Sequence, residues 1–125
     1  GVNIGLFCST PMVALSRNMN RKDAMKMLLT GEMIDASEAK RISLINDYTS
    51  ENNLSEYVDN LAKEITKKSR RVIKHGKEAF YKQLDKNLSD AYIYTSKIMA
   101  KNVLKDDAIE GINAFLDKRD PSWKD

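Results

Sequence analysis

Few residues of this chain have side chains whose types and spacing could perform covalent or metal chemistry. Cys8 is the only cysteine and His75 the only histidine among the 125 residues. A single cysteine excludes an internal disulfide and favours a reducing compartment. With one Cys and one His the sequence also disfavours a structural zinc site, and their wide separation disfavours a Cys/His catalytic pair. We therefore interpret Cys8 as a small buried apolar residue and His75 as a surface residue, and we expect no metal site.

A second group that could bind a ligand is basic. Residues 63–82 contain eight Lys or Arg residues and only two Glu residues. Such a cluster could contact the phosphates of a nucleic acid or of another anion. However, Phe80 and Tyr81 stand at its end, so it has no interleaved aromatic residues on which bases could stack. We therefore interpret the basic residues of segment 63–82 as the solvated face of two amphipathic helices, and we expect no nucleic-acid partner.

Length and composition limit the class of protein further. The chain has 125 residues, of which 42% are hydrophobic and 31% charged, with a net charge of +3. This suits one domain, or part of one, and the five Gly and two Pro exclude collagen-like and Pro/Gly-rich disordered classes. No apolar run approaches the ~20 residues that span a bilayer, and residues 1–11 lack the basic start of a signal peptide.

The elements of the first 50 residues are predicted to be short. Within residues 2–7, the side chains of Val2, Ile4, Leu6 and Phe7 are apolar and β-prone, and they predict the end of a buried strand that enters a loop. We expect short helices over residues 11–17 and 21–30, the second ended by Gly31. Asp35 and Glu38 have the spacing of a capping box before another short helix. Residues 44–49 predict a short strand or an irregular crossover.

The remaining residues predict long amphipathic helices, because apolar residues recur at intervals of three and four. Ser69 is predicted to cap the second of these helices, and Asp107 with Glu110 to form a capping box on the last, which Pro121 is expected to end. The expected apolar stripes are Leu54, Val58, Leu61 and Ile65; Val72, Ile73, Gly76, Ala79, Phe80 and Leu84; Leu88, Ala91, Tyr92, Thr95, Ile98 and Met99; and Ile109, Ile112, Phe115 and Leu116. A helical array with one unpaired strand suggests part of a larger α/β fold.

Several runs together resemble the crotonase superfamily, the enoyl-CoA hydratase/isomerase proteins. They are GLFCSTP at residues 5–11, AMKMLLTG at 24–31, IDASEA at 34–39 and EGINAFLDKR at 110–119. The run GVNIGLFCSTP is most similar to the subgroup called enoyl-CoA hydratase domain-containing proteins. The resemblance implies a mainly α fold, the C-terminal helical region of a crotonase-like α/β fold with a strand remnant at its start. Within a single domain over residues 1–125, it implies the end of the spiral core at 1–10, short helices and a crossover at 11–50, and a trimerisation region at 51–125.

The resemblance also implies acyl-CoA chemistry, in which backbone N–H groups stabilise an enolate-like thioester oxygen and two glutamates move protons. The oxyanion-hole groups and the first glutamate belong to the spiral, and Gly1 occupies the place of the second glutamate. We therefore expect no catalytic residue in this chain. Lys118 maps onto a lysine that contacts coenzyme A, and Met99 onto an aromatic residue near the adenine. Ser43 stands where many members have glycine.

The resulting expectation is a chain that binds acyl-CoA and assembles oligomers but does not catalyse alone. Its partners would be an acyl-CoA and, in the full-length protein, the other copies of a homotrimer or hexamer; no cofactor besides the coenzyme A thioester is implied. The resemblance favours mitochondria, with the cytoplasm as the alternative. Two other functions remain open, a free-standing helical module that binds proteins through exposed apolar stripes and, less favoured, a nucleic-acid binder that uses residues 63–82.

Overall fold

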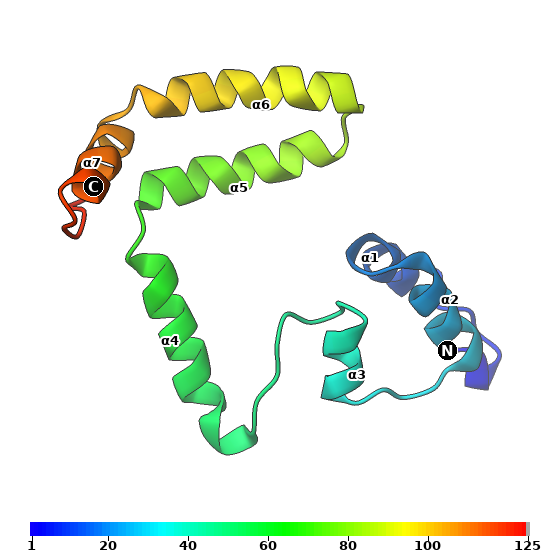
Figure 1. The fold of residues 1–125 in the computed structure, drawn as a ribbon. Helices are drawn as coiled ribbons and strands as arrows, with labels where there is room; N and C mark the ends of the chain where they lie inside the picture. Colours follow the sequence, from blue (N-terminus) through cyan, green and yellow to red (C-terminus); the bar gives the residue numbers. More distant parts are fainter. Residues whose placement is uncertain (125) are drawn as a thin grey trace. The chain divides into compact units, whose positions relative to one another are not determined.

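The computed structural model describes residues 1–124, and the chain divides into two compact units, Gly1–Ser55 and Glu56–Asp125. The first unit contains three short α-helices and two 3-10 turns (Figure 1). In chain order these are η1 (Val2–Ile4), α1 (Pro11–Asn18), α2 (Arg21–Thr30), α3 (Ala36–Arg41) and η2 (Glu51–Asn53). The helices predicted over residues 11–17 and 21–30 are thus confirmed.

Local sequence explains where α2 begins and ends. The side chain of Asn20 accepts hydrogen bonds from the backbone N–H groups of Lys22 and Asp23, each at 3.0 Å. These bonds satisfy two of the donors that a helix start leaves unpaired. Gly31 ends the helix at a φ of 62°, a left-handed conformation that glycine adopts without steric cost.

The small core of the first unit joins its three helices. Met19, Ala24 and Ile42 are buried, and partly buried apolar side chains pack against them: Leu15, Met27, Ile34 and Leu44. The helical spacing of α2 places Ala24, Met27 and Leu28 on the more buried side of this helix.

The strand predicted over residues 2–7 is wrong. Residues 1–6 instead form a tight turn in which Ile4 and Leu6 donate backbone hydrogen bonds to the Gly1 carbonyl oxygen, and Gly5 donates to Val2. A strand would leave its backbone groups unpaired without a neighbouring strand, and residues 1–124 contain none. Local hydrogen bonds therefore replace those of a sheet.

The capping box predicted before α3 forms only in part. Asp35 accepts a hydrogen bond from the Glu38 N–H at 2.7 Å, as expected of an N-cap. The Glu38 carboxylate instead pairs with the Arg41 guanidinium through two bonds of 2.6 and 2.7 Å. The bidentate ion pair replaces the return bond of a capping box. Of the two alternatives for residues 44–49, the structure has the irregular crossover.

Ser43 follows α3 with a φ of 63°, a left-handed conformation that side chains disfavour. Ser43→Gly should therefore raise the free energy of unfolding by about 0.5 kcal/mol, because relief of the left-handed strain exceeds the extra entropy of an unfolded glycine. Urea denaturation measures this change. Ser37→Gly, inside α3, is the matched control and should lower stability by roughly 0.5–1 kcal/mol. An equal loss in both variants would contradict the prediction.

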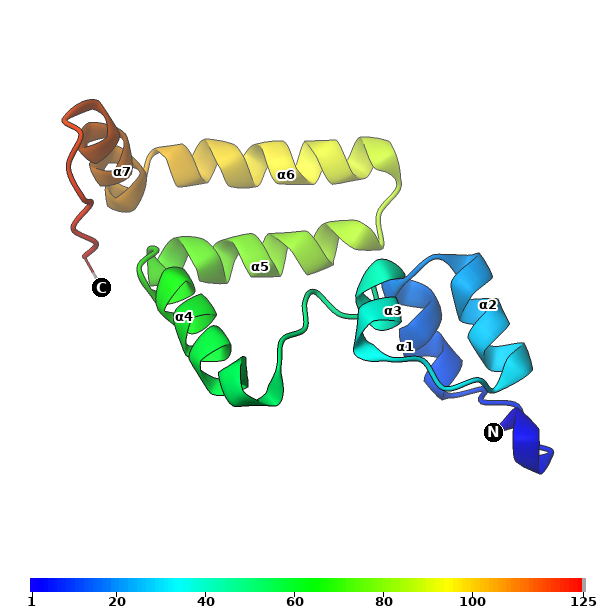
Figure 2. The ribbon, with the colours of Figure 1, turned by 60° about the horizontal axis from the view of Figure 1, so that its bottom comes forward.

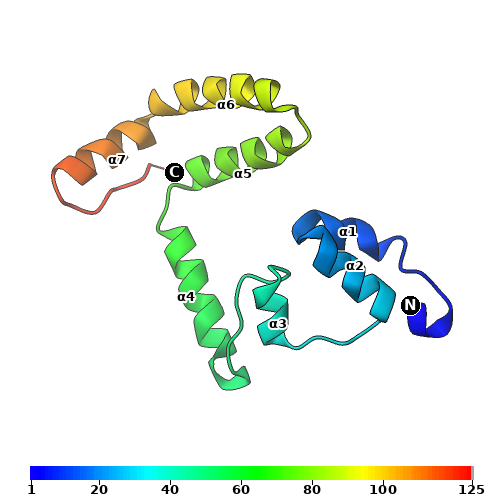
Figure 3. The same cartoon turned by 45° about the vertical axis from the view of Figure 1, so that its right-hand side comes forward.

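The second unit is formed by four helices: α4 (Leu54–Thr66), whose first turn crosses the unit boundary, α5 (Arg70–Leu84), α6 (Leu88–Val103) and α7 (Asp106–Leu116). Figure 2 shows α5 and α6 side by side as an antiparallel pair. Ser69 caps α5 as predicted, since its Oγ accepts the Val72 N–H at 3.1 Å. After α7 the chain turns back toward the start of α5 (Figure 3).

Two features of α7 differ from the prediction. The helix ends at Leu116, before Pro121, because Lys118 adopts a left-handed conformation with a φ of 52°. The apolar residues predicted to be buried by α7 are exposed; Phe115 is 82% and Leu116 69% exposed. Ala114 is the only buried apolar residue among the described residues of the second unit. This unit thus leaves large apolar side chains facing water.

None of the helices in residues 1–124 combines the length and the apolar character that a membrane span requires.

Candidate functional site

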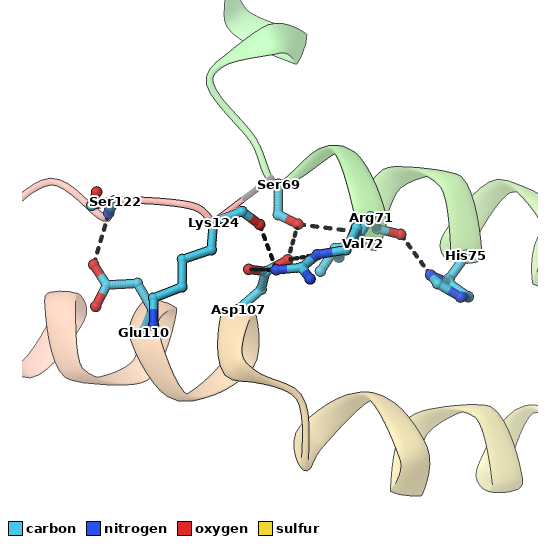
Figure 4. Close-up of polar contacts among 8 residues, drawn as sticks. All are labelled: Ser69, Arg71, Val72, His75, Asp107, Glu110, Ser122 and Lys124. Atoms are coloured by element: carbon cyan, nitrogen blue, oxygen red, sulfur yellow. Dashed lines mark hydrogen bonds and ion pairs between the residues drawn. The ribbon is translucent and has the colours of Figure 1, made fainter.

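A buried polar junction connects the starts of α5 and α7 (Figure 4). Asp107, which is 5% exposed, accepts a 2.6 Å hydrogen bond from the Ser69 hydroxyl. The Arg71 guanidinium donates to both oxygens of the same carboxylate, at 2.9 and 3.2 Å, and also to the Lys124 carbonyl oxygen. The junction therefore joins α5, α7 and the C-terminal segment through directional bonds.

The electrostatics of the junction favour an ionised Asp107. Hydrogen bonds from Arg71 and then from Ser69 hold the pKa of the Asp107 carboxyl below its ordinary value. The capping box predicted for Asp107 and Glu110 is wrong, because Lys105 occupies the N-cap position and has no side-chain cap bond. Both acidic side chains are instead bound to arginines, which offer charge-assisted bonds.

Glu110 fastens the C-terminal segment to α7. Its two carboxylate oxygens accept bonds of 2.7 and 3.0 Å from the Arg119 guanidinium. One of the same oxygens accepts the Ser122 N–H at 2.7 Å. The hydrogen bond from Arg119, followed by that from Ser122, lowers the pKa of Glu110 from 4.5 to about 2. Glu110 therefore remains charged in weakly acidic solution and holds the segment against α7.

This shift predicts how acid affects stability. The folded pKa of Glu110 lies below its unfolded value, so its stabilising contribution is complete above pH 4.5 and is lost as the pH falls through about 2. Glu110→Gln should therefore show a smaller fall of the urea midpoint between pH 6 and pH 2 than the unmodified chain. Glu56→Gln, at an exposed position of α4, is the matched control and should keep the original slope. Identical slopes for all three proteins would refute the assignment.

Trp123 holds the same segment from its other end. Its indole N–H donates to the Lys67 carbonyl oxygen at 2.7 Å, directly after α4. The ring lies over Gly111 of α7, where an added Cβ would stand 3.3 Å from the nearest indole carbon. Glycine at position 111 thus allows the indole to approach the helix closely.

An apolar groove of about 650 Å³ lies beside these contacts. Its lining comes mainly from α5, α7 and Trp123, and most of it is apolar: Val72, Ile73, Ala108, Gly111, Ile112, Phe115, Leu116 and Trp123, together with Lys68, Ser69, Asn102 and Asp107. Concave, mostly apolar surfaces with a few polar groups are typical of binding sites.

The residues predicted to contact coenzyme A are both at the surface of the second unit. Lys118 lies two residues beyond α7, and Met99 lies on α6 and is 66% exposed. The backbone N–H of Lys118 bonds to the Phe115 carbonyl oxygen at 3.3 Å, so an exposed aromatic residue stands one turn before the lysine. Two aromatic residues that line the groove, Phe115 and Trp123, were not among the predicted site residues, because the apolar spacing of the last helix predicts a buried Phe115 and no motif points to Trp123.

Comparison with known proteins gives a consistent result. A family model described as enoyl-CoA hydratase/isomerase matches residues 1–125. The mitochondrial enoyl-CoA hydratase domain-containing protein 3 is 50% identical in Rattus norvegicus and 49% in Homo sapiens, each over 123 residues. The match covers 98% of this chain and 41% of each relative, so the chain spans about two fifths of their length.

Solved structures agree. An enoyl-CoA hydratase from Mycobacterium smegmatis superimposes with a TM-score of 0.93 at 42% identity, over 98% of this chain and 48% of that one. The human enoyl coenzyme A hydratase domain-containing protein 3 gives a TM-score of 0.90 at 49% identity, over 98% and 49%. The mitochondrial names of the relatives agree with the location that the resemblance implies. The helical array, the sequence matches and the structural matches together establish that this chain belongs to the enoyl-CoA hydratase/isomerase family.

Proposed function

We propose that this chain is the acyl-CoA-covering and assembly part of an enoyl-CoA hydratase-family protein, and that it does not catalyse hydration alone. The apolar groove of the second unit supports this proposal most directly. A groove of about 650 Å³ lined by exposed side chains such as Ile112 and Leu116 gains free energy when another surface covers it. In an oligomer that surface is another copy of the protein, as expected for a trimer.

The contribution to ligand binding rests on the C-terminal end of α7, on Lys118 just after it, and on α6. Phe115 offers an exposed ring for stacking on adenine, and Lys118 offers an ammonium group for a phosphate. Met99 offers a flexible apolar side chain that can pack on the base without ring stacking. Coenzyme A itself, as the thioester of the substrate, is the only ligand that the proposal requires.

Light scattering on the purified 125-residue chain tests the assembly. We expect a defined trimer, and Leu116→Glu should convert it to a monomer because it places a charge in the groove. Leu88→Glu is the matched control, since Leu88 is 75% exposed on α6 and does not line the groove. It should leave the trimer intact. A monomeric parent chain, or equal behaviour of the two variants, would contradict the proposal.

Calorimetric titration with coenzyme A tests the ligand contacts. Lys118→Ala and Phe115→Ala should each weaken binding by roughly tenfold, whereas Lys82→Ala, at an exposed position of α5, should not.

Enoyl-CoA hydration by the 125-residue chain should equal the buffer blank, because Gly1 offers no proton-transferring side chain. Measurable turnover would refute the assignment of Gly1 to the place of the second glutamate.

The mitochondrial names of the relatives support a mitochondrial location for this protein.

A further inference from the structure

A separate cleft of about 220 Å³ lies between α5 and the C-terminal end of α6. It is lined by His75, Ile98, Lys101, Asn102 and Lys105. Two of these side chains are cationic, a third is an imidazole, and a fourth is an amide that can donate hydrogen bonds. None of the five is acidic. The lining thus combines several donors for an anion with one apolar wall.

His75 is oriented by its own helix. Its Nδ1 lies 2.7 Å from the Arg71 carbonyl oxygen (Figure 4). A carbonyl oxygen only accepts hydrogen bonds, so Nδ1 must have the hydrogen and Nε2 remains for a ligand. The contact also restricts the ring, which reduces the conformational entropy that binding would remove.

A neighbouring cleft of about 410 Å³ shares His75, Asn102 and Lys105 with the first, but its lining includes Asp106 and Asp107. The Asp107 carboxylate is already bound by Ser69 and Arg71, whereas Asp106 is an exposed acid that disfavours anions. An anion is therefore better placed in the smaller cleft.

We propose that the cleft of His75, Lys101, Asn102 and Lys105 binds the phosphate group of a small molecule. The two ammonium groups supply charge, the Asn102 amide can donate a hydrogen bond to a phosphate oxygen, and Nε2 of His75 can accept one from a P–OH group. This site does not use Lys118 and shares only Asn102 with the groove, so it does not depend on the function proposed above.

Phosphate binding can be followed through His75, because it is the only histidine in the sequence and its ring signals in proton NMR need no further assignment. Inorganic phosphate is added to the 125-residue chain at fixed pH, with sodium chloride holding the ionic strength constant. We expect a saturable shift of the ring signals with a half-point of about 1 mM. Lys101→Ala combined with Lys105→Ala should weaken this binding about tenfold or more.

Lys63→Ala combined with Lys82→Ala removes the same charge from positions outside the cleft and should leave the half-point unchanged. Circular dichroism of both double variants establishes that the helices remain folded. A shift that does not saturate, or an equal loss in the two double variants, would overturn the proposal, since either outcome shows only general screening of charge.

A second titration identifies the source of the phosphate. Tighter binding of adenosine diphosphate than of inorganic phosphate would show that the cleft takes a nucleotide, and equal binding that it takes free phosphate. Both results support a phosphate site. Binding of neither compound would overturn it.

Discussion

Replacing Trp123 by alanine should lower the free energy of unfolding by about 2 kcal/mol, less than for a fully buried tryptophan because the indole is only partly buried. The variant loses the ring packed on Gly111 and the hydrogen bond to the Lys67 carbonyl oxygen. Urea denaturation followed by far-UV circular dichroism measures the change. The midpoint should fall while the denaturant dependence of the unfolding free energy stays the same.

Two further variants separate the contributions of Trp123. Trp123→Phe keeps an aromatic ring over Gly111 and loses the N–H donor, so it should cost about 1 kcal/mol. Tyr92→Ala is the matched control, because Tyr92 is 68% exposed on α6, and it should change stability by less than about 0.5 kcal/mol. If Trp123→Ala were as mild as Tyr92→Ala, the C-terminal segment would not be held by its tryptophan.

Ser69→Ala should have the second largest effect, a loss of about 1–2 kcal/mol. The hydroxyl caps α5 by accepting the Val72 N–H and also donates to the buried Asp107 carboxylate. Its removal leaves the Val72 N–H without its capping bond, and the buried Asp107 carboxylate loses one hydrogen bond while it keeps those from Arg71. Urea denaturation of the variant, monitored by the fluorescence of the single tryptophan, measures the effect.

Ser96→Ala provides the control for Ser69→Ala. Ser96 is exposed within α6, and alanine has the higher helix propensity, so stability should stay the same or rise by a few tenths of a kcal/mol. Equal effects at positions 69 and 96 would show that the polar junction does not stabilise the second unit.

The sequence predicted the helices well where periodicity and capping residues agree. Gly31 ends α2 and Ser69 begins α5 because these residues act on the backbone next to them. The family could also be predicted from the sequence, because the motifs that resemble it are distributed over the whole chain. The strand at residues 2–7 failed for the opposite reason: a strand depends on a neighbour, and its apolar alternation does not reveal whether that neighbour is in the chain.

The candidate site was less predictable. Asp107 and Glu110 have the spacing of a capping box, but each bonds to an arginine outside α7, at positions 71 and 119. The spacing of two residues does not show whether their side chains bond to the backbone of their own helix or to an arginine elsewhere. Likewise, the apolar stripe of the last helix predicts that its side chains are buried against another element: Ile109, Ile112, Phe115 and Leu116. The stripe does not reveal that no element of the second unit buries them. The groove and the phosphate cleft emerge only once α5, α6 and α7 are placed together.

The polar junction has a consequence for how this protein meets other molecules. In the second unit, α7 is aligned with α5 by the bonds of Asp107 rather than by a sealed hydrocarbon interior. The apolar face of α7 can therefore remain exposed to solvent while the orientation of the helix is already fixed. A molecule that binds to this face would meet a preorganised surface, so little conformational entropy of the protein would be lost on association.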